Sequence, residues 1–390
     1  MLEPVPILFT IPNFITAGSG RAMLNIIERL DKSRVAPAVC VLKKGGDLDK
    51  EVESLGLPLL EAPFTIPARP YTSLWWRAWQ AARPFRKGRY QLWHSFHYID
   101  DYTEAIIARM AGAKAWIYTK KNMNWGRRSW YLRTLFSTKV LAQNSDMMRD
   151  FFDSPLYSRK VHLVPRGVDP NKYHPEVPPR LHLRRHLLIP PESVVAGVVA
   201  HLVPVKGHPT LLAAVAKVPD LHLLIAGKSM DQEYTGFLKD LVQSLGIQDR
   251  THFLGGVWDI PALLAEIDIF VLPTWGKWRM EGCPVALLEA MSSGRACIAT
   301  DIPGSRDLVE HGRSGFTVPP ENVEGLADAL HRLAFSKEMR TVLGTAARER
   351  VLQSYTIDKE VSAHLAIYEE VISKHNKRCS SRTSGTNFAN

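Results

Sequence analysis

The sequence predicts an α/β protein with two doubly wound domains, each built on a parallel sheet. Three observations support this. Short apolar, β-type runs alternate with segments of helical spacing along most of the chain, and such alternation is typical of parallel sheets with helices on both faces. A proline-rich break divides the series into two halves. The chain of 390 residues is also too long for one ordinary core.

The elements follow in order. The first half predicts strands at 5–10, 36–42, 91–93, 115–118, 139–142 and 161–164. The second half predicts strands at 194–199, 221–226, 251–254, 268–272, 296–299 and 315–318. Helical spacing is found at 20–30, 99–111, 207–216, 231–245 and 284–292.

The domain boundaries follow from this series. Residues 1–168 form the N-terminal domain and 192–355 the C-terminal domain. The segment 169–191 contains six prolines and is predicted to be a linker. A final helix over 356–373 buries one apolar stripe. The polar, basic tail 374–390 is predicted to be disordered.

Composition excludes several classes of protein. A hydrophobic content of 45% and a charged content of 23% are those of a globular chain. The four cysteines are far apart, which favours a reduced, cytosolic protein without a cysteine-ligated metal. No apolar run reaches the roughly 18–20 residues of a membrane span. The first apolar stretch has no basic region before it and is predicted to be a strand, not a signal peptide.

The net charge of +10 is concentrated in one region. Residues 62–139 contain fourteen Lys or Arg and three Asp or Glu, so the rest of the chain is near neutral. Seven of the ten tryptophans lie in the same region. This concentration favours one specialised basic face over general affinity for nucleic acid.

The run from Glu281 to Met291 carries the strongest functional signal. Pro284 suits the first turn of a helix because it has no N–H to lose there. Glu281 then lies in the loop before the helix, and Glu289 lies more than one turn inside it. Free N–H groups at the helix start attract anions. A ligand with hydroxyls at both ends and phosphate in the middle fits this arrangement, and a nucleotide sugar is such a ligand.

This run resembles the donor-site signature of glycosyltransferase family 4, the retaining enzymes of the GT-B fold. Further segments resemble the family in the right order, at 164–169, 199–207, 224–227, 253–255, 268–274, 301–304 and 312–316. Arg166 and His201 are departures, since the family usually has Asn and Arg there. The resemblance implies two Rossmann-like domains facing a cleft, with the final helix crossing back to the N-terminal domain.

The resemblance also implies roles at the donor site. Glu281 contacts the sugar hydroxyls and the reacting face, and Glu289 binds the ribose hydroxyls. The donor is expected to be a UDP- or GDP-sugar, bound without a cofactor or a metal. The other donor-binding candidates are Gly282, Cys283, Pro284, Val285, Ala286, Leu287, Leu288, Gly227, Gly18 and Gly20. For the last two, a single Gly-x-Gly is a weak signal, and a plain turn before a helix is the alternative.

Two basic residues are predicted to act on the leaving group. Open parallel sheets bind ligands beyond the carboxyl ends of their strands, and His201 and Lys206 follow the strand at 194–199. Lys206 can neutralise charge that grows on a departing diphosphate. His201 donates one hydrogen bond where an arginine would donate two, and it titrates near neutral pH. The alternatives are a packing role for His201 and a solvated surface position for Lys206.

The acceptor side is less defined. Family members often have a histidine after the strand equivalent to 115–118, and this chain has none there. Retaining transfer in this fold lets the leaving phosphate remove the acceptor proton, so a protein base is not required. The acceptor-binding candidates are Lys120 and Lys121, which suit an acidic acceptor, and His94 and His97, which are equally open to a packing role.

An aromatic and basic segment predicts a contact with a membrane surface. Tyr71, Trp75 and Trp79 are spaced four apart, so a helix aligns them. Such rings beside arginines suit the headgroup region of an anionic membrane. The accompanying arginines are Arg77, Arg83 and Arg86, and a possible extension contains Trp125, Arg127, Arg128, Trp130 and Arg133. The alternative places these tryptophans in the core.

The sequence therefore predicts a retaining hexosyltransferase that glycosylates a hydroxyl of a membrane-associated or anionic glycan or lipid. Such a reaction belongs to cell-surface polysaccharide, lipopolysaccharide or glycolipid synthesis. The expected location is the cytoplasm, with peripheral attachment to the inner face of the plasma membrane. Two alternatives stay open: a nucleotide-sugar epimerase of the same fold, and a non-catalytic surface-binding protein that kept the fold.

Overall fold

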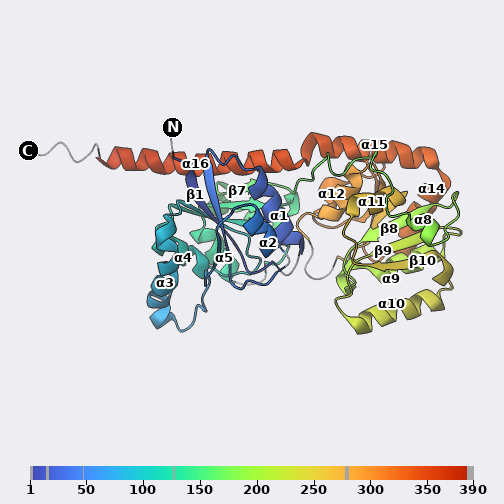
Figure 1. Cartoon of the computed structure of the whole chain (residues 1–390), viewed down its shortest axis with the longest axis horizontal. Coiled ribbons are helices and arrows are strands. Elements are labelled where there is room, and N and C mark those ends of the chain that lie inside the picture. The colour runs from blue at the N-terminus through green and yellow to red at the C-terminus, as the bar shows by residue number, and fades with distance from the viewer. Residues whose placement is uncertain (1–2, 15–16, 47, 126–127, 277–280, 384–390) are drawn as a thin grey trace, which may run out of the picture.

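The computed structural model has two parallel α/β domains side by side along its long axis, with the C-terminal helices running along one side of both (Figure 1). It describes residues 3–14, 17–46, 48–125, 128–276 and 281–383. The predicted pair of doubly wound domains is confirmed.

The N-terminal sheet has, among the described residues, seven strands in the order β3-β2-β1-β4-β5-β6-β7, and every neighbouring pair is parallel. The strands are β1 (Val5–Ile11), β2 (Val35–Val41), β3 (Leu59–Glu61), β4 (Leu92–Ser95), β5 (Ala115–Lys120), β6 (Lys139–Ala142) and β7 (Val161–Leu163).

Helices cover both faces of this sheet because β1 is apolar on both sides. Ile7 and Phe9 belong to a core with α1 (Ala17–Arg29) and α16 (Ile357–Thr383), whereas Leu8 belongs to a core with α3 (Leu74–Ala82) and α4 (Thr103–Met110). The helices of this domain are α1 (Ala17–Arg29), α2 (Asp49–Ser54), η1 (Tyr71–Ser73), α3 (Leu74–Ala82), η2 (Arg83–Gly88), α4 (Thr103–Met110), α5 (Arg128–Phe136), α6 (Ser145–Phe152) and α7 (Pro155–Ser158).

The C-terminal sheet has the order β10-β9-β8-β11-β12-β13, again with parallel neighbours throughout. Its strands are β8 (Val195–Val199), β9 (His222–Ala226), β10 (Thr251–Gly255), β11 (Ile269–Leu272), β12 (Ala296–Thr300) and β13 (Phe316–Val318). Its helices are α8 (Leu183–His186), η3 (Pro204–Lys206), α9 (His208–Ala216), α10 (Gln232–Ser244), η4 (Gln248–Arg250), α11 (Ile260–Glu266), α12 (Val285–Ser292), α13 (Ser305–Leu308), α14 (Val323–Phe335) and α15 (Lys337–Ser354).

The last helix, α16 (Ile357–Thr383), returns from the C-terminal domain and packs along the N-terminal domain, as predicted (Figure 1). Tyr368 is fully buried and contacts His94. At the point of crossing, the buried Arg166 guanidinium donates to Glu360 of α16 at 2.9 Å. Arg166 therefore has a structural role in joining α16 to the end of the N-terminal domain.

The structure differs from the sequence-based expectations in three places. The three-residue edge strand β3 was not predicted, because it is too short to show a period. The predicted linker contains α8, and its Ile189 is buried against the C-terminal domain. The tail predicted to be disordered from residue 374 continues α16 to Thr383, because polarity alone does not end a helix and no Gly or Pro intervenes.

Candidate active site

Loops that follow the parallel strands of the C-terminal domain meet at one edge of its sheet. His201 and Lys206 follow β8. Gly207 has a φ of 68°, and a Cβ atom there would lie 1.9 Å from the Pro273 carbonyl oxygen after β11. A Cβ atom at Gly227, after β9, would lie 1.8 Å from the Ala200 carbonyl oxygen in the loop that follows β8. Only glycine permits these approaches, so the two glycines bring the strand ends together.

Two of the three predicted catalytic residues, Lys206 and Glu281, form an ion pair at this edge, and His201 is the third. The Lys206 side chain is 14% exposed and the Glu281 side chain 43% exposed, so a ligand can reach the carboxylate. His201 lies nearby and is exposed. Partial burial of its ring, followed by the charges of Lys206 and Lys228, lowers the pKa of His201 below its ordinary value. At pH 7 its imidazole is therefore neutral.

Helix α12 begins directly after the donor loop, which we define as residues 281–283. Its first residue is Val285, one position later than predicted, and Pro284 precedes it as the N-cap. The Leu288 N–H was predicted to face the phosphates together with those of Val285 to Leu287. It donates instead to the Pro284 carbonyl and is not free for a phosphate. The N–H groups of the first turn, from Val285 to Leu287, have no carbonyl partner within the helix. They provide the positive helix end at the mouth of the site.

Cys283 is buried in this loop and does not act as a nucleophile. Burial raises the pKa of its thiol to about 12, so the thiolate is not populated near neutral pH. Its small side chain instead packs against Leu287 and Leu288 of α12 in the core of the C-terminal domain.

Glu289 lies further along α12, half-buried beside Tyr173. Burial raises the pKa of Glu289 to about 7, and a hydrogen bond from the Tyr173 hydroxyl opposes this rise. The Tyr173 main chain is fixed in turn, because its carbonyl accepts from Ser292 Oγ at 2.6 Å and from Arg348 Nη1 at 3.1 Å. Sequence analysis did not identify Tyr173, whose only signal is an aromatic residue within the predicted linker.

The Gly-rich stretch at the start of α1 approaches the same region, since the charge of Arg21 acts on Tyr173. Packing explains Gly20, because a Cβ atom there would lie 2.6 Å from the Phe14 ring. The space around Gly18 is open to 4 Å among the described atoms. Residues 15–16, which precede the stretch, lie outside the described part of the chain. Gly18 therefore stays a candidate for the donor site, whereas Gly20 has a structural reason to be glycine.

The two predicted acceptor histidines are packing residues. His94 has no exposed surface, and its ring nitrogens contact the Tyr368 hydroxyl at 2.6 Å and Thr119 Oγ1 at 2.9 Å. His97 is 3% exposed and its ring meets Phe64 edge-on. Burial lowers the pKa of His97 to about 3. The predicted role of His94 and His97 in acceptor binding is therefore wrong, because β4 and the loop after it are covered by other elements.

Lys120 is likewise part of the core. Its ammonium is 1% exposed, donates to three oxygens of Asn122 and Asn124 at 2.6–2.8 Å, and lies 3.8 Å from the Trp130 ring centroid. Burial, followed by the charge of Arg133, lowers the pKa of Lys120 to about 6, and the Asp100 carboxylate opposes this fall. Lys121 keeps some exposed surface and its ammonium donates to the Phe96 carbonyl, but desolvation around its amine lowers the pKa of Lys121 well below its ordinary value. Lys120 is thus removed from the acceptor candidates.

Four rings of η1 and α3 form an exposed patch that we call the aromatic face: Tyr71, Trp75, Trp76 and Trp79. Trp75 is 63% exposed and Trp79 38% exposed, so the alternative that places them in the core is wrong. The guanidinium groups of Arg83 and Arg86 lie 4.0 and 5.2 Å from the Trp79 ring centroid.

The predicted extension of this face is partly corrected. Trp130 is buried and Trp125 stacks on Phe151 with centroids 4.9 Å apart, so both pack inside the domain. Arg133 is also fully buried, and Arg127 lies outside the described residues. The apolar surface continues instead on α5, at Tyr131, Leu132, Leu135 and Phe136. Tyr102 joins the two parts, since it interacts with Tyr71 and its ring lies 6.1 Å from that of Phe136.

Arg77 differs from the other arginines of this region. Its guanidinium donates to the carbonyls of Pro67 and Pro70 at 2.7 and 2.9 Å, and to Ser73 Oγ at 3.1 Å. These bonds fix the loop before α3. Arg77 therefore orders the aromatic face, while Arg83 and Arg86 supply its accessible positive charge.

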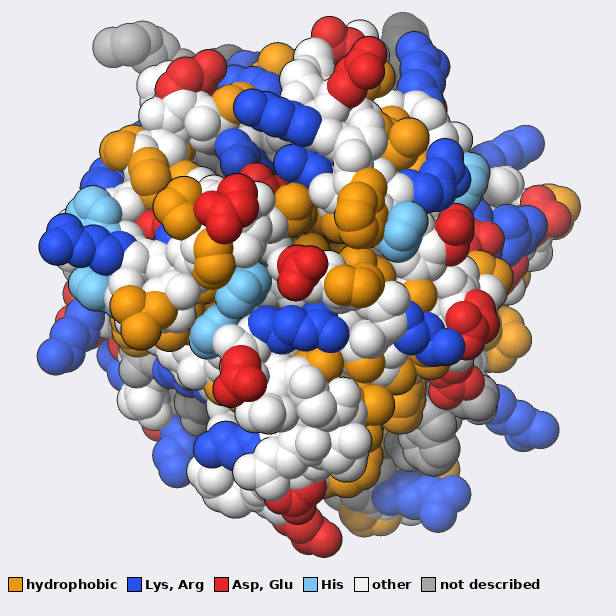
Figure 2. Space-filling view, turned by 90° about the vertical axis from the view of Figure 1, so that its right-hand side faces the viewer, with side chains coloured by type: hydrophobic (Ala, Val, Ile, Leu, Met, Phe, Trp, Pro, Cys, Tyr) orange, Lys and Arg blue, Asp and Glu red, His pale blue; other side chains and the backbone are white. Residues whose placement is uncertain are grey.

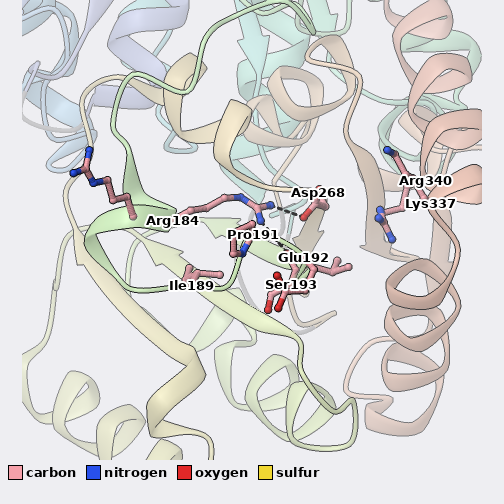
Figure 3. A pocket seen from close by; sticks show the side chains of 10 residues that line it. Arg184, Ile189, Pro191, Glu192, Ser193, Asp268, Lys337 and Arg340 are labelled. Atoms are coloured by element: carbon pink, nitrogen blue, oxygen red, sulfur yellow. Dashed lines mark hydrogen bonds and ion pairs between the residues drawn. The ribbon is translucent and has the colours of Figure 1, made fainter.

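The C-terminal domain also has a polar hollow of about 700 Å³ at the opposite edge of its sheet, near Val194 and Asp268 (Figure 3). Arg184 donates to Asp268 at 2.7 Å there, and Arg340 donates to the Leu333 carbonyl at 2.6 Å. These two arginines of the hollow therefore have structural partners. The end of the molecule on this side mixes acidic, basic and apolar side chains (Figure 2).

No group of three or more His, Cys, Asp or Glu side chains is placed to hold a metal ion in the part of the chain described. No described helix combines the length and the apolar character that crossing a bilayer requires.

Two family models match the chain, one on each domain. Residues 16–172 match the model described as Glycosyltransferase Family 4. Residues 180–350 match the model described as Glycosyl transferases group 1. The second match contains the donor loop, Lys206 and Glu289.

Two curated relatives illustrate the similarity. A GDP-mannose-dependent alpha-(1-6)-phosphatidylinositol monomannoside mannosyltransferase of Mycobacterium tuberculosis is 29% identical over 231 residues, covering 57% of this chain. The aligned part is 59% of that relative, which is less than two thirds of its length. A UDP-Gal:alpha-D-GlcNAc-diphosphoundecaprenol alpha-1,3-galactosyltransferase of Escherichia coli is 27% identical over 310 residues, 74% of this chain and 77% of that one.

A solved structure supports the fold. HepE of Anabaena, crystallised with UDP and glucose, superposes with a TM-score of 0.79 at 19% identity, over 93% of this chain and 99% of that one. At this identity the likeness concerns the fold alone, and it agrees with the GT-B architecture expected from the sequence.

Proposed function

Because the chain belongs to glycosyltransferase family 4, we propose that it transfers a hexose, with retention of configuration, from a nucleotide sugar to a lipid-linked or otherwise anionic acceptor. The observation that carries this proposal is the Lys206–Glu281 ion pair at the mouth of α12. Glu289 follows on the same helix. Together they provide one cation and a positive helix end for a diphosphate, and two carboxylates for the hydroxyls on either side of it.

The donor is proposed to lie along α12. Its diphosphate faces the N–H groups of Val285 to Leu287, where the helix dipole favours negative charge. Its ribose hydroxyls donate to Glu289, and its sugar hydroxyls donate to Glu281. This orientation leaves the anomeric carbon near the N-terminal domain, which contacts the donor loop.

Lys206 is proposed to stabilise the leaving diphosphate. The bond from the anomeric carbon to the phosphate oxygen breaks, and the acceptor oxygen forms its new bond on the same face of the sugar. The acceptor proton passes to the departing phosphate oxygen. Charge on that phosphate grows toward the transition state, so a lysine here acts mainly on the rate. Neutral His201 adds one hydrogen bond without adding charge.

Charge compensation by Lys206 and α12 is proposed to replace a metal ion. In the unliganded pair, Glu281 neutralises Lys206. An incoming diphosphate competes for the ammonium and releases the Glu281 carboxylate to bind the sugar. Activity is therefore expected to survive a metal chelator. Loss of activity in EDTA that Mg²⁺ or Mn²⁺ restores would contradict this part of the proposal.

The nature of the acceptor is proposed from the relatives. The names of the two relatives contain phosphatidylinositol and diphosphoundecaprenol, both lipids that carry phosphate. An acceptor of this class needs a protein that works at a membrane surface. The same names contain one GDP-sugar and one UDP-sugar, so both bases are candidates.

The aromatic face is proposed to hold the enzyme on an anionic membrane, at the inner face of the plasma membrane. Its exposed rings can enter the headgroup layer, while Arg83 and Arg86 attract anionic lipid. The apolar surface of α5 continues this contact. Lys121, near the donor loop, remains the candidate for contact with an acidic group of the acceptor.

A donor and acceptor screen tests the function. Purified protein is incubated with UDP- and GDP-hexoses, with and without vesicles that contain a diphosphate-linked or phosphatidylinositol-linked glycan, and the released nucleotide and the product linkage are measured. We expect one donor to be turned over faster with the lipid acceptor, with α-configured donor giving α-linked product. Inversion of configuration would overturn the retaining assignment. Glu281→Gln should remove transfer, and full transfer by that variant would overturn the site.

A further inference from the structure

We propose that the N-terminal domain positions the donor loop through Asn144, so that the catalytic carboxylate Glu281 is aligned only when the two domains are docked. This inference deepens the proposed function and rests on it. Asn144 lies at the carboxyl end of β6, where it caps α6. It is a positioning residue, because it acts on the reaction through Gly282 and touches no reacting atom.

Gly282 is held from both sides by main-chain and side-chain groups of the other domain. Its N–H donates to the Lys121 carbonyl at 2.9 Å. Its carbonyl accepts from Asn144 Nδ2 at 2.7 Å. The adjoining residues Asn122 and Glu281 form an antiparallel bridge. The donor loop is therefore joined to the loop after β5 through an isolated bridge and the two hydrogen bonds of Gly282.

The fit around Gly282 leaves no room for a side chain. A Cβ atom there would lie 2.8 Å from Gln143 Oε1, the Lys121 carbonyl and Met147 Cε, all of the N-terminal domain. On the other side, a Cβ atom at Gly304 would lie 2.6 Å from the Gly282 carbonyl oxygen. Glycine at 282 is thus required by close packing between the domains, which is a reason independent of any ligand.

Asn144 is suited to this role because both ends of its carboxamide are used. Its side chain has no exposed surface. Oδ1 accepts from the Met147 N–H at 2.7 Å and so caps α6. This bond fixes the orientation of the amide and directs Nδ2 at the Gly282 carbonyl. A capping residue alone needs only the acceptor, so the donor half of the carboxamide serves the interface between the domains.

Further contacts join α6 of the N-terminal domain to α13 of the C-terminal domain. Asp307 of α13 accepts from the Ser145 N–H at 2.6 Å and from Ser145 Oγ at 2.5 Å. Arg306 of α13 pairs with Asp146 of α6 at 3.2 Å. The amino end of α6 is therefore bound by the C-terminal domain at Asp307 while Asn144 binds the donor loop.

The consequence is a coupling between acceptor side and donor side. Glu281 precedes Gly282 and pairs with Lys206. When the domains separate, Gly282 loses both bonds to the N-terminal domain, and the main chain that carries Glu281 loses its support. The start of α12 and Glu289, which are proposed to bind the nucleotide, belong to the C-terminal domain. Of the proposed donor contacts, only those of Glu281 and Gly18 depend on this docking. Domain docking should therefore affect turnover more than donor affinity.

The test compares Asn144→Ser with Asn322→Ser. Ser retains the cap in both variants, but it is too short to reach the Gly282 carbonyl. Asn322 caps α14 by accepting from the Gly325 N–H, and within the described part of the chain its side chain makes no hydrogen bond to the N-terminal domain. We expect Asn144→Ser to lower kcat about tenfold or more, a change of about 1.4 kcal/mol, with less than about threefold change in donor Kd. Asn322→Ser should change neither.

Hydrogen exchange provides a readout that does not need activity. In Asn144→Ser, the peptide that contains the Gly282 amide should exchange faster, while peptides of β8 and β9 exchange as in wild type. Wild-type exchange of that peptide together with wild-type kcat would overturn the inference, and so would equal effects of the two Ser variants. If Asn144→Ser fails to fold, Asn144→Asp, which keeps the cap and the size but loses the donor, takes its place. A wild-type protein that transfers no sugar overturns the proposed function, and the exchange comparison then decides the positioning role.

Discussion

The two domains share one architecture, but they differ in how far the polar side chains near the carboxyl ends of their strands are exposed to solvent. In the C-terminal domain, Lys206 and Glu281 pair with each other, and the carboxylate stays 43% exposed. In the N-terminal domain, Lys120 and Arg133 are buried and bind oxygens of their own domain. The edge of a parallel sheet thus predicts where polar groups gather. The surrounding loops decide whether a ligand can reach them.

The reason lies in what covers each edge. In the N-terminal domain, the chain after β5 folds back, so that carbonyls of Asn122 and Asn124 surround the Lys120 ammonium. In the C-terminal domain, Gly207 and Gly227 keep the loops short and close to the strand ends. One edge therefore becomes an internal polar network, and the other stays open as a ligand site.

The largest expected effect breaks the internal network. Glu104 has no exposed surface, accepts from Trp93 Nε1 at 3.0 Å and Ser95 Oγ at 2.6 Å, and lies 3.6 Å from the buried Arg133 guanidinium. Glu104→Ala leaves that guanidinium without its carboxylate. We expect a loss of about 3–5 kcal/mol in the free energy of unfolding, measured by denaturant titration of the full chain.

Two variants make this a comparison of the domains. Lys217→Ala removes an exposed pair with Glu324 in the C-terminal domain, whose side chains are 49% and 77% exposed, and it should cost about 1 kcal/mol or less. The double variant Glu104→Met/Arg133→Met removes both buried charges and should recover most of the loss. A small effect of Glu104→Ala would show that the network is solvated and that the two edges differ less than described.

The next effect concerns rate instead of stability. Lys206→Ala should lower kcat about 100-fold, because the leaving diphosphate loses its cation as its charge grows, while donor Kd changes much less. Steady-state kinetics and donor titration measure the two separately. Lys120→Met is the matched change in the N-terminal domain and should lower stability more than kcat. An equal fall in kcat for both lysines would mean that burial does not separate the two edges.

The donor side was predictable because its signal is local in the sequence. Proline before a helix, carboxylates on both sides of its start and glycines after strands each act over a few residues. Hence Glu281 and Lys206 were correctly placed at one edge, and the strand bounds agree within two residues. The start of α12 differed by one residue, because Pro284 serves as the cap.

The acceptor side was not predictable in the same way, because burial there depends on residues far apart in the chain. Lys120 is predicted from the sequence to bind an acidic acceptor, but Trp130 and the folded-back loop cover its ammonium. His94 is buried by Tyr368, which lies 274 positions later. Asn144 reads as an ordinary helix cap, and its second bond joins a residue of the other domain. No local pattern contains these contacts.

The pH dependence of donor binding sharpens the comparison further. Burial raises the pKa of Glu289 to about 7. The ionised carboxylate accepts from two ribose hydroxyls, so the donor favours the deprotonated form. Below this pKa the donor must displace a proton, and its affinity should fall by at most about tenfold per pH unit. Above it the affinity should level off. Calorimetric titration with the donor at pH values below and above the pKa of Glu289 measures this change in affinity.

Two variants assign this titration. Glu289→Gln should bind more weakly and without the pH dependence. Tyr173→Phe removes a hydrogen bond that lowers the pKa of Glu289, so its profile should move to higher pH. In the N-terminal domain, burial lowers the pKa of His97 to about 3. His97 therefore does not titrate near the pKa of Glu289 and does not contribute to this pH dependence. A wild-type profile that is flat, or one that Glu289→Gln retains, would contradict the assignment to Glu289.

The smallest expected effect distinguishes the outer surfaces of the two domains. If the aromatic face enters a headgroup layer, burial of its rings gives a contribution that salt does not change, and Arg83 and Arg86 give one that salt screens. Each basic residue near the surface contributes about 1 kcal/mol, so attachment is reversible. The protein should sediment with anionic vesicles at low salt, bind neutral vesicles less and be partly released as salt rises. Trp75→Ser/Trp79→Ser should weaken vesicle binding about tenfold and leave the unfolding midpoint unchanged, because both rings are exposed.

Trp258 of the C-terminal domain is 82% exposed, and Trp258→Ser is the matched control that should bind vesicles as the wild type does. Equal losses for the two surfaces would mean that any exposed tryptophan supports binding. A wild type that ignores anionic vesicles would leave Arg83 and Arg86 free to recognise acidic groups of a water-soluble acceptor, and the difference between the two domains would then be one of ligand chemistry alone.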